Sequence, residues 1–167
     1  RIQSIFSPRI DEMKFVVMLK EYLAMEYSKA NLKSLRTGVV HLDIWFDNMH
    51  FDNDDGITLF DFDFCGNGWL CLDIAYFLFQ LYNTNPYEAG FKLKAEAFLS
   101  GYESIQQISD EEKRILAMAG LCVFLFYLGV QCDRFDTWSN IFLNEDHLKR
   151  FTGVLKRWMA YNNIQVS

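Results

Sequence analysis

Most of the chain shows the apolar spacing of amphipathic or buried helices. From residue 11 to about residue 35, apolar side chains recur every three or four positions behind Asp11, which can cap the first turn. After residue 69 the same kind of spacing predicts further helices, over residues 70–82, 87–105, an apolar stretch opened by Ser109 and running to residue 130, and 145–161. The chain is therefore expected to be mostly helical.

Short extended segments interrupt this pattern between residues 38 and 60. Residues 38–42 have the composition of one strand, and residues 49–52 and 57–60 that of two more. The link between the latter two ends in Asp55-Gly56, and an Asp-Gly pair between two such segments predicts a β-hairpin. The predicted fold class is α+β, mostly helical, with one short β-hairpin, in a single domain over residues 1–167.

The apolar run over residues 115–130 raises the question of a membrane. A helix that spans a bilayer needs roughly 20 such residues. Here charged side chains stand close on both sides, at residues 110–114 and at Asp133. We therefore expect a buried core helix and no membrane partner.

Composition narrows the classes of partner and compartment. The net charge is −6, so the sequence offers no basic face to nucleic acid. The cysteines have neither the close pairing of a zinc site nor the density of a disulfide framework. We expect these residues to lie in apolar surroundings, and we expect the protein to reside in a reducing cytoplasm. The cysteines are Cys65, Cys71, Cys122 and Cys132.

Side chains suited to phosphoryl transfer are concentrated between residues 41 and 73. The carboxylate of Asp43 and the carboxamide of Asn48 are separated by a four-residue loop and can face one cleft, and Asp61 follows the hairpin and can return to the same place. Phosphoryl transfer needs a carboxylate that orients the attacking hydroxyl and accepts its proton, and oxygen ligands that hold Mg²⁺ at the phosphates. Asp43 suits the first role, and Asn48 and Asp61 suit the second.

Several spaced elements in this region resemble one known family in their order. They are His41-x-Asp43-x-x-x-x-Asn48, then Asp61-Phe62-Asp63 beyond the hairpin, then Leu72-Asp73-Ile74-Ala75. This arrangement is similar to the catalytic loop and metal motif of the phosphotransferase family that includes aminoglycoside, choline, methylthioribose and homoserine kinases, and that shares its fold with protein kinases. The resemblance covers nearly the whole chain and about half of the family's usual protein.

The resemblance implies a role for each matching residue. Asp43 would be the catalytic base, and the Mg²⁺ ligands would be Asn48 and Asp61, with Asp63 as a further candidate. His41 would support the loop, and Asp73 would be the buried aspartate that accepts its backbone N–H groups. ATP and a small hydroxyl-bearing acceptor would be the substrates.

The sequence also departs from the family. Leu42 stands where the family usually has glycine, and residues 44–47 replace its usual turn. No Gly-rich phosphate loop with a partner lysine precedes the motif. We therefore expect a truncated chain that holds only the C-terminal lobe, turns over little by itself, and can form a homodimer through the surface that the missing lobe would cover.

Other polar residues receive weaker or structural interpretations. Because acceptor sites in this fold lie between helices, the candidate acceptor wall is Asp133, Asp136 and Trp138. His50 and His147 are interpreted as structural. The acidic cluster at residues 52–55 is interpreted as a solvated hairpin tip, because it lacks the terminal glutamate of a calcium loop.

Two alternatives to a kinase stay open. The chain could be a catalytically inactive binding or regulatory module that keeps the fold. It could also be a metal-dependent hydrolase that uses His41 and Asp43, although this region has few histidines for such a site. The acidic balance would suit a cationic acceptor without identifying it.

Overall fold

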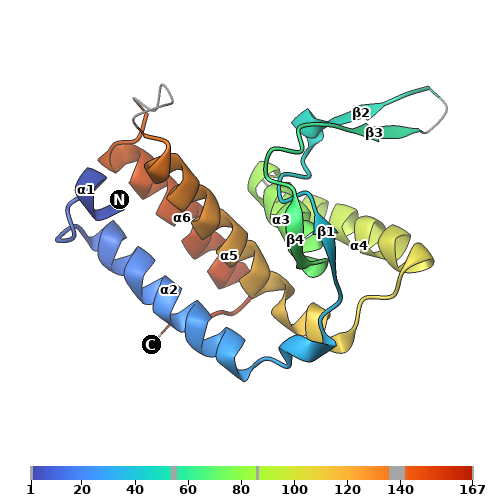
Figure 1. The fold of residues 1–167 in the computed structure, drawn as a ribbon, viewed down its shortest axis with the longest axis horizontal. Coiled ribbons are helices and arrows are strands. Elements are labelled where there is room, and N and C mark those ends of the chain that lie inside the picture. The colour runs from blue at the N-terminus through green and yellow to red at the C-terminus, as the bar shows by residue number, and fades with distance from the viewer. Residues whose placement is uncertain (1, 54–55, 86, 136–141, 167) are drawn as a thin grey trace. The chain divides into compact units, whose positions relative to one another are not determined.

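The described chain is mostly helical, as the apolar spacing predicts. The computed structural model describes residues 2–53, 56–85, 87–135 and 142–166. Its helices are α1 (Ile2–Ile5), α2 (Asp11–Lys29), α3 (Cys71–Thr84), α4 (Glu88–Ile105), α5 (Asp110–Asp133) and α6 (Glu145–Tyr161), with short 3₁₀ turns at Leu32–Ser34 and Phe46–Asn48. Its strands are β1 (Thr37–Val40), β2 (Met49–Phe51), β3 (Ile57–Leu59) and β4 (Gly66–Trp69) (Figure 1).

Contacts divide the chain into two compact units. The helical unit comprises Arg1–Ala30 and Leu121–Ser167, and the mixed unit comprises Asn31–Gly120. Helix α5 contributes its first part to the mixed unit and its second part to the helical unit. A single domain over the whole chain stays a prediction.

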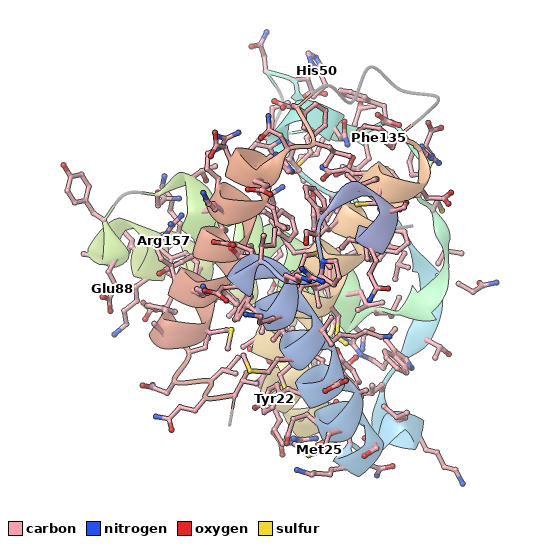
Figure 2. The ribbon with its side chains drawn as sticks, turned by 90° about the vertical axis from the view of Figure 1, so that its left-hand side faces the viewer. Tyr22, Met25, His50, Glu88, Phe135 and Arg157 are labelled. Atoms are coloured by element: carbon pink, nitrogen blue, oxygen red, sulfur yellow. The ribbon has the colours of Figure 1, made fainter. Side chains whose placement is uncertain are left out.

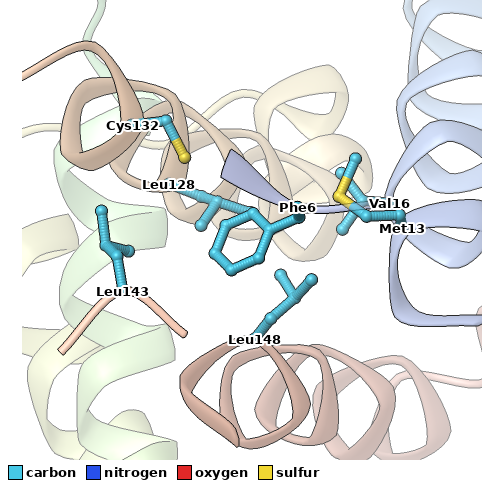
Figure 3. Close-up of a cluster of buried hydrophobic side chains, with 7 residues drawn as sticks. All are labelled: Phe6, Met13, Val16, Leu128, Cys132, Leu143 and Leu148. Atoms are coloured by element: carbon cyan, nitrogen blue, oxygen red, sulfur yellow. The ribbon is translucent and has the colours of Figure 1, made fainter. Parts of the chain in front are cut away.

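The core of the helical unit joins α2, α6 and the second part of α5. The Phe6 ring lies between Leu128 and Leu148 (Figure 3). The other buried members of this cluster are Met13, Val16, Cys132 and Leu143. Helix α6 begins where the side chain of Asn144 accepts the backbone N–H of His147 at 2.9 Å, a standard N-cap. Its observed bounds are those that the sequence predicts.

Helix α2 buries only part of the apolar stripe that predicts it. Phe15, Leu19 and Leu23 are buried, whereas Met18 and Met25 are exposed. Met25 is labelled in Figure 2. The predicted end near residue 35 is wrong, because the helix ends at Lys29 and the next residue is extended. Long-range contacts explain the difference: the Asn31 N–H donates to Glu111 Oε1 at 2.8 Å, and Leu35 is buried in the mixed unit.

Two small antiparallel sheets stand in the mixed unit. β2 pairs with β3, from Met49 opposite Leu59 to Phe51 opposite Ile57, at the place predicted for the hairpin. β1 pairs with β4, a strand that the sequence analysis missed because its Gly-Asn-Gly-Trp sequence has low β-propensity. At Gly68 a Cβ would lie 2.9 Å from Val40 Cγ2, so a larger residue would force the buried Val40 side chain to shift.

Helix α5 is a core helix in both units, although by length and composition it could cross a membrane. Ile115 and Ala119 are fully buried in the mixed unit, and Leu121 and Leu128 in the helical unit. The burial of these side chains supports the interpretation of the run as a core helix.

The four cysteines are free and differ in exposure. Cys71 and Cys132 are buried and Cys122 is half-buried, as expected. Burial raises the pKa of Cys71 to about 12 and that of Cys122 to about 11. The expectation of apolar surroundings is wrong for Cys65, which is exposed because it lies in a surface turn where its N–H donates to Phe62 O.

Candidate functional site

The first turn of α3 holds the backbone of the loop that follows β1. One carboxylate oxygen of Asp73 accepts the N–H of His41 at 2.8 Å, and the other accepts the N–H of Leu42 at 2.7 Å. Burial raises the pKa of Asp73 above the usual aspartate range, while the two N–H donors oppose that shift. The carboxylate therefore fixes the start of the 41–48 loop, the position that the resemblance implies for it.

His41 connects this loop to the segment that follows the hairpin. Its Nδ1 lies 3.3 Å from the N–H of Asp43 and so acts as an acceptor, which leaves Nε2 to donate to Phe60 O at 3.1 Å. The ring is 5% exposed and packs on Phe62, with 4.8 Å between ring centroids. His41 is thus a buried link between two loops.

Asn48 brings the loop back to Asp43. Its Nδ2 donates to the backbone oxygen of Asp43 at 2.9 Å and to Asp43 Oδ2 at 3.0 Å. The backbone oxygen of Asn48 accepts the N–H of Phe60 at 3.2 Å, so Phe60 is hydrogen-bonded on both sides, to Asn48 and to His41. These two bonds attach the backbone just before Asp61 to the 41–48 loop, which contains Asp43.

Asp61 and Asp63 leave their carboxylates in solvent. Asp61 has φ of 64°, a left-handed conformation that aspartate tolerates better than most residues. Both side chains are exposed, and within the described residues neither forms a hydrogen bond or an ion pair. Their carboxylate oxygens are available as ligands.

Carboxylate and carboxamide oxygens are ligands of the type that Mg²⁺ prefers. The Asn48 amide donates through its nitrogen, and its Oδ1 separately accepts no hydrogen bond from the described part of the chain. Among the described residues, no group of three or more His, Cys, Asp or Glu side chains could hold a metal. Mg²⁺ does not need such a cage, because it is commonly bound by one or two carboxylates together with substrate phosphates and water.

A tyrosine that the sequence analysis did not assign to the site also contacts Asp43. The Tyr76 hydroxyl donates to Asp43 Oδ1 at 2.6 Å and accepts from Gln80 Nε2 at 2.9 Å. Asp73, Tyr76 and Gln80 are three and four residues apart, so they share one face of α3. That spacing behind Asp73 is the only sequence signal that could have pointed to Tyr76.

Aromatic rings attach the remaining part of the loop to α3 and α4. Trp45 contacts Phe46 with ring centroids 5.3 Å apart, and Phe46 meets Phe77 edge-on at 5.5 Å. Phe77 then packs on Phe98 of α4 at 4.4 Å. These contacts stand where the family's usual turn sequence is replaced.

The other predicted positions belong to the helical unit, to the hairpin, or to residues outside the described ranges. Asp133 is an exposed residue at the end of α5 in the helical unit. Asp136 and Trp138 lie outside the described residues, so the acceptor wall stays a prediction. Asp52 Oδ1 accepts the N–H of Gly56 at 2.7 Å, a local turn contact.

The two remaining histidines, His50 and His147, belong to different units. His50 is exposed on β2 (Figure 2). His147 packs on Phe142 and Phe151, and burial lowers its pKa. Both positions agree with a structural interpretation.

Comparison with known proteins gives the family. Residues 9–108 match the phosphotransferase enzyme family. The chain is similar to an uncharacterized protein of Synechocystis, at 36% identity over 59% of this chain and 27% of the relative. It is also similar to the homoserine kinases of Bradyrhizobium diazoefficiens, at 30% identity over 66% of this chain and 34% of the relative, and of Sinorhizobium fredii, at 35% over 60% and 31%.

The chain spans about a third of the length of these relatives or less. The family match, however, covers more than half of the chain and includes every residue from His41 to Gln80 in the cluster described above. The chain belongs to the phosphotransferase enzyme family.

Proposed function

We propose that the mixed unit carries the catalytic residues of an ATP-dependent kinase that phosphorylates a hydroxyl of a small molecule. The observation that carries this proposal is the hydrogen-bonded connection between two loops. Asp73 holds the start of the 41–48 loop, and His41 and Asn48 both bind the backbone of Phe60. This connection supports the proposal that Asp43 and Asp61 serve one site.

Asp43 is the proposed base. Its carboxylate orients the acceptor hydroxyl and takes its proton as the hydroxyl oxygen forms a bond to the γ-phosphorus and the bond to the bridging oxygen of ADP breaks. The products are ADP and a phosphate monoester, and the proton passes from Asp43 to solvent. Each carboxylate oxygen has two acceptor positions, so Asp43 keeps room for the acceptor although it is already bonded to Tyr76 and Asn48.

The proposed metal ligands are Asn48 Oδ1 and Asp61, with Asp63 as a further candidate. When bound, Mg²⁺ would neutralise charge on the transferred phosphate. The protein's own contribution is then to hold oxygen atoms and the base in fixed positions, which supplies much of the rate enhancement in reactions of this class.

The proposed acceptor is a small alcohol that also bears an amine. Two relatives are named homoserine kinases, and homoserine is such an alcohol. The net charge of −6 would suit a cationic group on the acceptor. Choline and aminoglycosides also carry a cationic nitrogen and stay in the candidate set, whereas methylthioribose, which carries none, is the alternative without that group. The proposed compartment is the cytoplasm.

A homodimer is also proposed, on the basis of apolar side chains that the mixed unit exposes. Phe51, Ile57 and Phe62 are 54%, 58% and 55% exposed. Such a surface is commonly covered by a partner or by another part of the protein. Sedimentation velocity at rising concentration is expected to show a dimer of this chain, and a monomer at every concentration would remove the proposal.

The experiment that tests the kinase measures ATP consumption with Mg²⁺ against homoserine, choline, methylthioribose and aminoglycosides. Both this chain and the complete gene product that contains it are assayed. We expect acceptor-dependent turnover from the complete product, and little from this chain alone because its sequence has no Gly-rich phosphate loop. Asp43→Asn is expected to lower kcat by about a hundredfold or more, because it removes the base.

Asp47→Asn is the matched control. Asp47 lies in the same loop, is exposed, and forms no hydrogen bond or ion pair with the described residues, so its replacement should leave turnover unchanged. Full turnover in Asp43→Asn would exclude Asp43 as the base. If no protein shows turnover with any acceptor of the panel, the second candidate is favoured, a binding module without turnover.

A further inference from the structure

Two donors from different elements hold the Asp43 carboxylate. Asn48, in the same loop, donates to Oδ2 at 3.0 Å, and Tyr76, on α3, donates to Oδ1 at 2.6 Å. A single donor would leave the carboxylate free to rotate about its Cβ–Cγ bond. Two donors on opposite oxygens fix its plane, and hydrogen bonds to a charged acceptor are among the strong ones.

Gln80 determines the direction of the Tyr76 hydroxyl. A phenol has one proton to donate, and its oxygen can also accept. Gln80 Nε2 donates to this oxygen at 2.9 Å, so the proton of Tyr76 is left to point at Asp43. Tyr76 is 3% exposed, which protects this contact from competition with water.

Helix α3 therefore fixes both the backbone and the side chain of the loop. Asp73 binds the N–H groups of His41 and Leu42, and Tyr76, one turn later on the same face, binds the side chain of Asp43. Because the three polar residues of α3 belong to one rigid helix, the base is set at a fixed position relative to its own loop.

We propose that Tyr76 is a positioning residue for the base, with Gln80 acting through it. Tyr76 need not touch either substrate; it holds the Asp43 carboxylate in the orientation that meets the acceptor hydroxyl. The inference rests on the proposed role of Asp43. It adds two residues, from outside the loop and the metal motif, to the machinery of the reaction.

The kinetic test uses Tyr76→Phe, which removes the hydroxyl and keeps the ring, in the complete gene product. We expect kcat to fall by about tenfold to a hundredfold, with both KM values within about twofold of wild type, because misorientation of the base slows the chemical step without removing a binding contact. Tyr82→Phe is the matched control on the same helix, because the Tyr82 ring packs on Phe91. Its kinetics should equal those of wild type.

A double-mutant cycle tests whether Gln80 acts through Tyr76. Gln80→Leu should lower kcat less than Tyr76→Phe does, and the double variant should be no slower than Tyr76→Phe alone. If the losses in kcat from the two substitutions add in the double variant, Gln80 does not act through Tyr76. Gln80→Leu also carries the test if Tyr76→Phe fails to fold, since it leaves Tyr76 in place.

A second measurement does not depend on turnover. The side-chain amide of Asn48 donates to Asp43, so its ¹H–¹⁵N signals, assigned with Asn48→Ala, report the carboxylate's position. They should shift and broaden in Tyr76→Phe and stay unchanged in Tyr82→Phe. If they stay unchanged in Tyr76→Phe, the positioning role is excluded whatever the kinetics show. If the Asn48 signals shift in Tyr76→Phe while wild type turns over no acceptor, the proposed kinase function is excluded. The conclusion that Tyr76 positions the Asp43 carboxylate is then retained.

Discussion

At the scale of single residues, Leu42 has a backbone conformation that leucine seldom adopts. Its φ is 62°, and for a residue with a Cβ this region costs roughly 1–2 kcal/mol. The hydrogen bond from its N–H to Asp73 holds it there. This is the position where the family usually has glycine, so the departure seen in the sequence corresponds to local strain beside the proposed base.

Leu42→Gly is expected to relieve this strain. Two effects reduce the resulting gain in the free energy of unfolding. Glycine has a larger conformational entropy in the unfolded chain, which costs about 0.5–1 kcal/mol, and the half-buried leucine side chain is lost. Leu42→Ala loses nearly the same packing and keeps the strain. Urea unfolding should therefore find Leu42→Gly more stable than Leu42→Ala by about 0.5–1 kcal/mol.

Glu96, exposed in the middle of α4, provides the comparison site. There the order should reverse, with alanine more stable than glycine by about 1 kcal/mol. If alanine is the better residue at both positions, the left-handed backbone at residue 42 carries no measurable cost.

At the scale of elements, a buried ion pair fastens the start of α5 to the segment before β1. Arg36 Nε lies 2.9 Å from both carboxylate oxygens of Glu112, whose side chain is fully buried. Ser109 and Glu112 also form a capping box, in which each side chain accepts the other's N–H. Burial alone would raise the pKa of Glu112, but the bonds from Arg36 and Ser109 outweigh it and hold the pKa below its usual value.

Glu112→Gln is expected to destabilise the protein by about 3–5 kcal/mol at pH 7, because it leaves the Arg36 charge partly buried without its partner. The stabilisation belongs to the ionised carboxylate, whose pKa is lower in the folded state. It is therefore complete above the pKa of an unfolded glutamate, about 4.3, and is lost as the pH falls below it. Urea unfolding from pH 7 to pH 3 should show the difference from wild type shrinking.

Lys149→Gln serves as the control, because it removes an exposed ion pair in which Lys149 lies 3.9 Å from Asp146. Exposed pairs of this kind contribute little to stability, so the urea midpoint of Lys149→Gln should equal that of wild type at every pH. A loss in Glu112→Gln that stays constant down to pH 3 would show that the carboxylate's charge is not what stabilises this contact.

Elements whose signals are local could be predicted from the sequence, and those that depend on distant contacts could not. Helix α6 was predicted with its observed bounds because its stripe and cap lie within one segment. β4 was missed because its pairing with β1 spans about thirty residues, and α2 ends early because Asn31 binds Glu111. At the site the same distinction holds: the spacing from His41 to Asn48 predicts the loop, whereas the contact of Tyr76 with Asp43 joins residues 33 apart in the sequence.

At the scale of the whole molecule, α5 is the element common to both compact units. Its fully buried side chains include Ile115 in the mixed unit and Leu121 and Leu128 in the helical unit. A helix is cooperative along its length, because each hydrogen bond after the first turn costs less to form. Unfolding of either unit would remove the packing that stabilises one half of this helix.

We therefore expect one unfolding transition, as the single-domain prediction requires. Ile115→Ala and Leu128→Ala remove buried side chains in different units, and each should lower the stability of both by about 2–5 kcal/mol. Hydrogen exchange measured in peptides from α3 and from α6 reports the two units separately. Leu93→Ala, at a position on α4 that is 71% exposed, should leave both peptides at wild-type protection. If Ile115→Ala speeds exchange in α3 alone, and Leu128→Ala in α6 alone, the two units unfold independently and the chain has two domains.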